Sequence, residues 1–181
     1  HTFVEDRSLF QLPVAFYIVA DFEAFNAPCS DVNYSKKTTK LTEHDPNSFG
    51  YKVICPLNDT FSKPYVSYRG DNAVGKFLEA IFTEEEWIEQ RLNEFKQSKP
   101  NLSPEEERSF RAQRFCYLCC REFDGTFIWK VRDHCHVTGK YRSAACNHCN
   151  LKLVVPSRIP VIFHNLQGYD GHLIMQAIGK F

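Results

Sequence analysis

Two Cys-x-x-Cys pairs are the residues of this chain whose type and spacing most directly predict chemistry. The first pair is Cys116 and Cys119, and the second is Cys146 and Cys149. Each pair can place two thiolates on one metal ion from a tight turn, and the two pairs together complete a tetrahedral shell. Because zinc prefers this shell, the spacing predicts a structural zinc site.

Other assignments of the cysteines stay open at the level of sequence, because the chain contains eight of them. Cys120, Cys135 and His148 lie close enough in sequence to replace one of the four ligands. Disulfides or free buried thiols are the alternative to a metal site.

Further polar residues lie between and after the two pairs, where a purely structural zinc site does not need them. The segment contains an Asp-His-Cys-His run, a Gly-Lys-Tyr-Arg run and an asparagine directly after the last cysteine, at residues 133–136, residues 139–142 and Asn150. These residue types indicate a function beyond holding zinc.

This pattern resembles that of the His-Me finger nucleases, also called HNH or ββα-metal nucleases, and in particular the recombination endonuclease VII branch. The resemblance implies that the four cysteines hold zinc and that His134 is the general base. It also implies that Asp133 and Asn150 hold a catalytic magnesium or manganese ion, and that His136 is a further active-site histidine. Leu153 departs from the family pattern, which has an acidic residue at that position.

The chemistry of these side chains agrees with the implied roles. A neutral imidazole, with a pKa of about 6.5, can take a proton from water and so create the nucleophile for attack on phosphorus. The Asp133 carboxylate and the Asn150 carbonyl are hard oxygen donors of the kind that suits magnesium. A histidine that only stabilises a zinc-bound DNA-binding finger is the alternative reading of His134.

A second group of candidate residues lies outside the cysteine-rich segment. Asp21 and Glu23 are two residues apart at the end of a predicted strand, so both carboxylates project from one face. A later His-Asn-Leu-Gln-Gly-Tyr-Asp run contains Asn165 and Asp170.

Together these two elements resemble the first and second exonuclease motifs of protein-primed family B DNA polymerases, such as those of Polinton-like (Maverick) elements. The resemblance implies an RNase H-like fold in which Asp21, Glu23 and Asp170 bind metal ions and Asn165 contacts DNA. The third exonuclease motif of that family does not occur before Phe181. We therefore expect a truncated RNase H-like domain.

The elements that must position these residues follow from hydrophobic periodicity and from turn and capping signals. An irregular segment is expected over residues 26–47. Thr83, followed by Glu84, Glu85 and Glu86, resembles a helix cap and predicts a break in the long helix. Ser103, followed by Pro104, Glu105 and Glu106, predicts the cap of the next helix. The pattern predicts strands at residues 13–25, 49–55, 63–68 and 158–165, and helices at residues 71–95, at residues 104–113 and at the end of the chain.

The predicted fold class is α/β. A truncated RNase H-like domain, made of residues 1–103 and 156–181, is interrupted by a zinc-bound ββα-metal finger at residues 104–155.

Composition limits the partners that this domain can have. Twenty-two basic residues balance twenty-two acidic ones, but residues 110–160 hold nine basic and three acidic side chains, which favours DNA as the partner. Because no apolar stretch reaches the roughly 18 residues of a spanning helix, no membrane association is expected. We expect an intracellular protein, nuclear if the source is eukaryotic. The sequence does not predict the oligomeric state.

The main functional hypothesis is a metal-dependent DNA endonuclease with structural zinc and catalytic magnesium or manganese. Two alternatives stay open: a non-catalytic DNA-binding or scaffold module in which zinc only holds the fold, and a remnant 3′-to-5′ proofreading exonuclease.

Overall fold

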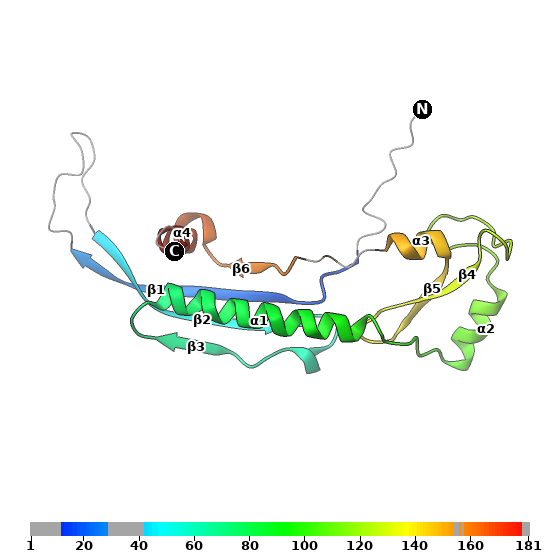
Figure 1. Cartoon of the computed structure of the whole chain (residues 1–181), viewed down its shortest axis with the longest axis horizontal. Coiled ribbons are helices and arrows are strands. Elements are labelled where there is room, and N and C mark those ends of the chain that lie inside the picture. Colours follow the sequence, from blue (N-terminus) through cyan, green and yellow to red (C-terminus); the bar gives the residue numbers. More distant parts are fainter. Residues whose placement is uncertain (1–11, 29–41, 154–155, 157, 179–181) are drawn as a thin grey trace, which may run out of the picture. The chain divides into compact units, whose positions relative to one another are not determined.

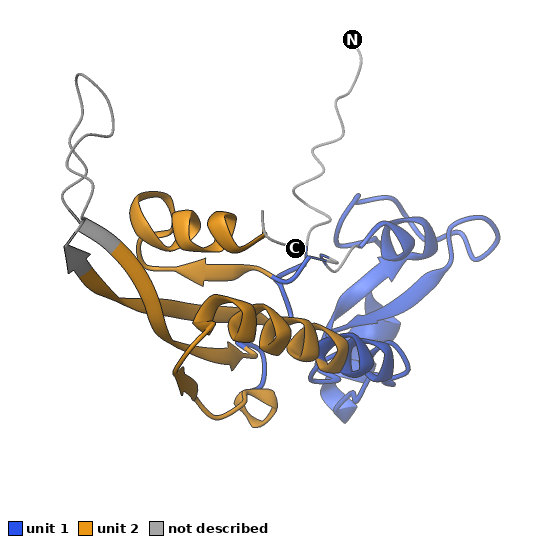
Figure 2. Ribbon diagram, turned by 60° about the vertical axis from the view of Figure 1, so that its left-hand side comes forward, with its two compact units in different colours: residues 1–15, 56–58, 88–159 blue, residues 16–55, 59–87, 160–181 orange. Residues whose placement is uncertain are grey.

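The computed structural model describes residues 12–28, 42–153, 156 and 158–178. The chain forms two compact units, which Figure 2 shows in different colours. Unit 1 comprises residues 1–15, 56–58 and 88–159, and unit 2 comprises residues 16–55, 59–87 and 160–181. Both units are assembled from segments that are far apart in the sequence.

Unit 2 contains a four-stranded sheet with the order β3-β2-β1-β6 (Figure 1). The neighbours β3, β2 and β1 are antiparallel, whereas β6 pairs in parallel with β1 through Ile18 to Ala20. The strands are β1 (Tyr17–Pro28), β2 (Thr42–Ile54), β3 (Val66–Arg69) and β6 (Val161–Phe163).

One face of this sheet forms the core of unit 2, because β1 buries alternate side chains there: Ile18, Ala20 and Phe22. Helix α1 (Ala73–Phe95) contributes Phe77 to the same core. The Phe77 ring lies in edge contact with aromatic rings of three strands, those of Phe22, Phe49, Tyr51 and Phe163.

Helix α1 is continuous, so the predicted break near Thr83 is wrong. The Thr83 hydroxyl donates to the carbonyl of Glu79 in the preceding turn at 3.0 Å and caps nothing. Glu84, which looked like part of the capping signal, is buried and accepts hydrogen bonds from Tyr51 and Lys63. A tertiary contact therefore explains the acidic residue that resembled a cap.

The irregular segment predicted over residues 26–47 is also wrong at its two ends. β1 continues to Pro28 and β2 begins at Thr42, and these polar extensions pair in the order Ala24 with Pro46 to Pro28 with Thr42. Backbone hydrogen bonds between the two strands hold this ribbon. Its sequence does not alternate between apolar and polar residues, and that alternation is the pattern from which a half-buried strand is predicted. The remainder of the segment, residues 29–41, lies outside the described residues.

Unit 1 contains a β-hairpin followed directly by a helix. Its elements are α2 (Pro104–Ala112), β4 (Lys130–His134), β5 (Tyr141–Cys146) and α3 (Asn147–Lys152). The predicted cap of α2 is confirmed, since the Ser103 hydroxyl and the Glu106 carboxylate bond each other's backbone N–H groups. Lys130 fixes the other end of α2 by donating to the carbonyls of Phe110, Arg111 and Gln113.

The remaining elements are a short 3-10 helix, η2 (Asp59–Phe61), a π-helical turn, η3 (Leu166–Asp170), and the closing helix α4 (Gly171–Ile178). The mixed α/β class is confirmed, while the RNase H-like fold stays a prediction. None of the helices in the described part of the chain has the length and apolar character needed to cross a membrane.

The Phe77→Ala substitution tests the core of unit 2. We expect a loss of about 3–5 kcal/mol in the free energy of unfolding, because the vacated volume lies among four aromatic rings that cannot close over it. Urea denaturation followed by circular dichroism measures the loss. The control is Phe82→Ala on the same helix, which removes a ring that is 61% exposed and is expected to cost within about 0.5 kcal/mol. Equal costs for the two variants would contradict the packing described above.

Candidate metal centre and adjacent pocket

Four cysteine sulfurs converge at one point of unit 1. The sulfurs of Cys116, Cys119, Cys146 and Cys149 all lie within 4.8 Å of one another, and those of Cys119 and Cys146 are 3.9 Å apart. Backbone N–H groups support the cluster, since Cys146 donates to the sulfur of Cys116 at 3.2 Å and Cys149 donates to the sulfur of Cys146 at 3.3 Å. The predicted convergence of the two pairs is thus confirmed.

The cluster fits a zinc ion. A tetrahedral ion with bonds of about 2.3 Å places its sulfur ligands roughly 3.8 Å apart, close to the separation found here. Burial raises the pKa of the Cys119 thiol, but hydrogen bonds from the Arg121 side chain and backbone and from two cysteines of the cluster together outweigh burial and lower this pKa to about 6. Thiolate is the form that binds zinc.

The competing assignments of the cysteines find no support in the geometry. Cys120 is exposed and Cys135 lies apart from the cluster, and His148 is exposed on α3. Each cysteine in the described ranges is a free thiol, so the disulfide alternative is wrong for these residues. Among the described residues, the four cysteines are the one group of three or more acidic, histidine or cysteine side chains close enough to hold a metal ion.

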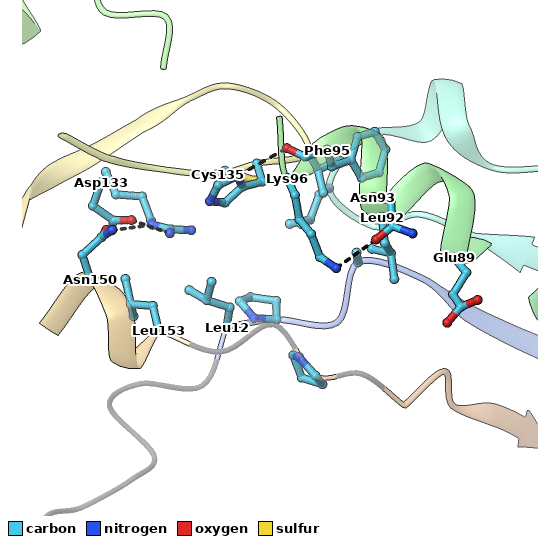
Figure 3. A pocket seen from close by; sticks show the side chains of 17 residues that line it. Leu12, Glu89, Leu92, Asn93, Phe95, Lys96, Asp133, Cys135, Asn150 and Leu153 are labelled. Carbon is cyan, nitrogen blue, oxygen red and sulfur yellow. Dashed lines mark hydrogen bonds and ion pairs between the residues drawn. The ribbon is translucent and has the colours of Figure 1, made fainter. Parts of the chain in front are cut away.

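A cavity of about 630 Å³ lies next to this centre, and all the residues that line it belong to unit 1. Figure 3 shows the side chains of Asp133 and Asn150 close together at one end of the cavity, with Leu153 beside Asn150. The end of helix α1 forms another part of the wall. Further lining residues are Leu92, Phe95, Lys96, Cys135, His136 and Arg142.

The Asp133 carboxylate is 3% exposed and is held by two partners. Arg142, on the paired strand, bonds it twice, with Nη2 at 2.6 Å from Oδ1 and Nε at 2.8 Å from Oδ2. Tyr117 donates its hydroxyl to Oδ2 at 2.6 Å. Burial and the hydrogen bond to Asp133 raise the pKa of the Tyr117 hydroxyl, so it stays a donor. The buried charge is therefore paired and its orientation is fixed.

Asn150 lies on the first turns of α3, whose N-cap is the zinc-site residue Cys146. The Asn150 side chain lines the cavity together with Asp133. The amide oxygen and the Asp133 carboxylate are hard donors that fit a magnesium ion. Leu153 also lines the cavity, and its apolar side chain offers no oxygen to a metal ion.

Two histidines follow Asp133 and differ in their hydrogen bonds. Nδ1 of His134 lies 3.3 Å from the carbonyl of Arg132, and Nε2 lies 3.1 Å from the carbonyl of Ser98. Because a carbonyl only accepts and a neutral imidazole has one N–H group, neutral His134 can donate to one of these two carbonyls. His136 has one such contact, from Nδ1 to the carbonyl of Phe95 at 3.3 Å, which leaves Nε2 as an acceptor.

The two rings are neighbours, with centroids 4.6 Å apart, but His136 lines the cavity and His134 does not. Burial lowers the pKa of His136 below its usual value, and the nearby His134 lowers it further. The neutral, proton-accepting form of His136 is thereby favoured.

The exonuclease-like residues lie in unit 2. Asp21 and Glu23 are exposed on β1, and Asn165 accepts the N–H of Gly168 at the start of the π-helical turn. Asp170 is fully buried, and its Oδ1 accepts the N–H of Phe22 at 3.2 Å, whereas its Oδ2 has no partner. The turn thus brings Asp170 to β1, but the three carboxylates do not form a group that could hold a metal ion.

Sequence reasoning missed the roles of Tyr117 and Arg142 around Asp133. Regular pairing would not have revealed Arg142, because Asp133 pairs with Ser143 and a residue next to the paired one points to the opposite face; Arg142 lies at the register shift between Asp133 and His134. Tyr117 lies inside the first Cys-x-x-Cys turn, and nothing in the sequence indicates that its hydroxyl reaches a residue sixteen positions away.

Comparison with known families gives one match. Residues 93–157 match the profile of the family described as Recombination endonuclease VII. This segment contains the four cysteines, Asp133, both histidines and Asn150. No curated protein and no solved structure matches the chain. Nothing in these comparisons relates the chain to a DNA polymerase.

Substitution of one cysteine of the cluster tests the metal centre. We expect the purified protein to contain one zinc ion per chain and Cys146→Ser to lose it, because three remaining thiolates and a neutral hydroxyl hold zinc poorly. Elemental mass spectrometry after dialysis measures the zinc content. Cys120→Ser is the matched control, since it removes the exposed thiol next to Cys119 and is expected to keep the zinc. Zinc loss in both variants, or in neither, would contradict the four-sulfur site.

Proposed function

We propose that this protein is a metal-dependent DNA endonuclease whose active site is the cavity of unit 1. One observation carries the proposal: Asp133, His136 and Asn150 line one cavity beside a four-cysteine cluster, in a segment that matches the endonuclease VII family. Zinc would hold the hairpin and helix that supply these side chains. DNA is the substrate that the family match and the local excess of basic residues support.

His136 is the residue that we assign as general base, in place of His134. The Phe95 carbonyl fixes the tautomer of His136, with the proton on Nδ1 and the lone pair of Nε2 free to take a proton from water. His134 has a backbone carbonyl beside each ring nitrogen and does not line the cavity. We therefore assign it a donor role beside the phosphate.

Asp133 and Asn150 would hold the divalent cation. A magnesium or manganese ion bound there would neutralise charge on the scissile phosphate and on the departing oxygen. Tyr117 and Arg142 keep the Asp133 carboxylate in one orientation. The chain thus supplies one charged oxygen donor from the hairpin and one neutral oxygen donor from α3.

A non-catalytic DNA-binding module is the second candidate function, and two observations favour it. The Asp133 carboxylate already has three hydrogen bonds, which compete with a cation for its lone pairs. Leu153 supplies no oxygen to the cavity. This alternative requires DNA binding that weakens steeply with salt, without cleavage under any divalent ion.

The proofreading exonuclease has less support than either candidate. Asp21, Glu23 and Asp170 do not gather into a metal-binding group, and no comparison relates the chain to a polymerase. A proofreading exonuclease would release single nucleotides from a free DNA end, and Asp21→Ala would reduce that activity.

A plasmid assay tests the proposed active site. With magnesium or manganese we expect the protein to convert closed circular DNA to the nicked form, and His136→Ala to slow nicking about 100-fold or more, because no other group replaces the proton acceptor. His134→Ala is expected to lose less activity than His136→Ala. Gel electrophoresis over time gives the rates, and zinc content is measured in parallel.

His148→Ala is the matched control, because this exposed histidine lies between two zinc ligands on α3 and outside the cavity. It should nick at the wild-type rate. Binding without nicking by the wild-type protein would leave the non-catalytic module as the function, and full activity of His136→Ala would remove that residue from the mechanism.

The hydroxyl of Tyr117 allows a separate test of how Asp133 is positioned. We expect Tyr117→Phe to weaken manganese binding about tenfold, because hydrogen bonds to a ligating carboxylate orient it for the metal. Manganese electron paramagnetic resonance measures the free ion without any cleavage step. Tyr65→Phe, which removes an exposed hydroxyl in unit 2, should bind manganese as the wild type does. Unchanged or tighter binding by Tyr117→Phe would mean that its hydroxyl competes with the cation.

A further inference from the structure

The cavity of unit 1 extends beyond the candidate catalytic residues to the end of helix α1. Glu89, Asn93 and Lys96 line this part of it, and their spacing places them on one face of the helix. The helical turn continues to Lys96, the residue after α1, whose backbone N–H donates to the carbonyl of Leu92 at 3.1 Å. Figure 3 shows Asn93 and Lys96 together, apart from Asp133. We call the part lined by Glu89, Asn93 and Lys96 the α1 end of the cavity.

The α1 end combines hydrogen-bonding groups with apolar walls. Nζ of Lys96 donates to Oδ1 of Asn93 at 2.9 Å, and the other N–H groups of both side chains are further donors. The Glu89 carboxylate, on the same helix face, is an acceptor. Apolar side chains make up most of the remaining wall of the cavity, among them Leu12, Leu57, Leu92, Phe95, Val137 and Pro156.

The two ends of the cavity suit different parts of a nucleotide. The end at Asp133 and Asn150 is where the proposed cation would meet a phosphate. At the α1 end the opposite charges of Glu89 and Lys96 cancel, so this end gives a phosphate no net attraction. An uncharged ring with polar edges fits it, because the apolar walls can cover the faces of the ring while donors and an acceptor meet its edge. A nucleobase is such a ring.

The α1 end is also tied to the candidate general base. The carbonyl of Phe95, two residues after Asn93, accepts the hydrogen bond from Nδ1 of His136 at 3.3 Å. The cavity of about 630 Å³ is in the size range of sites that enclose one small molecule, about 300–1,000 Å³. One nucleotide can therefore enter it, whereas a stacked duplex cannot, so a base that enters must be unpaired. An apolar side chain of a peptide would match the walls and leave the polar groups of the α1 end without partners.

We propose that the α1 end of the cavity is a subsite for one unpaired nucleobase of the DNA substrate. Asn93 and Lys96 donate to the edge of the base, Glu89 accepts from it, and Leu92 contacts its face. The subsite selects DNA that contains an unpaired nucleotide, which phosphate contacts alone do not distinguish. This inference rests on the proposed function as far as DNA is the substrate, and it does not require cleavage.

Fluorescence anisotropy with two labelled duplexes tests the proposal. Each duplex carries one unpaired nucleotide at its centre, which has its base in one duplex and is abasic in the other, so the two have the same number of phosphates. No divalent cation and no chelator is added, so the DNA stays intact and the zinc stays bound. We expect the protein to bind the duplex with the base about tenfold more tightly, because the abasic nucleotide lacks the hydrogen bonds and apolar contacts of the base.

Asn93→Ala and Lys96→Ala should each reduce this tenfold preference to about threefold or less. The ratio of the two affinities is the readout, because the loss of the Lys96 charge weakens binding to both duplexes equally. Both side chains are exposed, so neither substitution is expected to disturb the fold. Gln90→Ala is the matched control, since it removes an exposed amide of the same helix that does not line the cavity, and it should keep the preference.

Equal binding of the two duplexes by the wild-type protein would overturn the subsite alone. A preference that persists unchanged in Asn93→Ala and Lys96→Ala would also overturn it, because the base would then bind elsewhere. Failure of the wild-type protein to bind either duplex would overturn the proposed function together with this inference. A tenfold preference without nicking would remove cleavage from the proposed function and still support the subsite.

Discussion

The convergence of four sulfurs on one point is the constraint on which the chemistry of unit 1 depends. The apolar cluster around it is small, with Cys116, Ala145, Cys146 and Cys149 as its buried members. A core of this size supplies little hydrophobic stabilisation, so a metal ion is the natural source of the remainder. The same four residues fix both halves of the candidate site. Cys146 caps the helix that carries Asn150, and the first cysteine turn carries the tyrosine that bonds Asp133.

Asp133 shows how stability and function oppose each other at this site. A carboxylate that is 3% exposed needs partners, because an unpaired buried charge costs several kcal/mol. Arg142 and Tyr117 provide them and fix the orientation of the group. In the proposed active site, Arg142 and Tyr117 would orient Asp133 for a divalent ion without contacting that ion themselves.

Features of the fold and of the candidate site could be predicted from the sequence where they depend on residues that are close in sequence. They could not be predicted where they depend on tertiary contacts. The cysteine pairs and the Ser103 cap of α2 are local patterns, and both are found where they were expected. The break predicted at Thr83 is wrong, because Glu84 does not take part in a cap. It accepts hydrogen bonds from Tyr51 and Lys63, which are distant in sequence. For the same reason the sequence, which made His134 the general base by resemblance, could not show the carbonyl partners that distinguish the hydrogen bonds of the two histidines.

Those carbonyl partners lie at the end of α1 and just after it, where the sequence pattern indicates no functional residue. The carbonyl of Phe95, the last residue of α1, accepts the hydrogen bond of His136, and the carbonyl of Ser98, three residues later, accepts that of His134. The family match begins at residue 93 and therefore includes both carbonyls, whereas the sequence pattern placed the start of the finger at residue 104. Since a backbone carbonyl is present at every residue, no side-chain pattern could reveal this contribution. The candidate site is consequently larger than its motif, because backbone carbonyls that precede the motif by more than thirty residues contact both of its histidines.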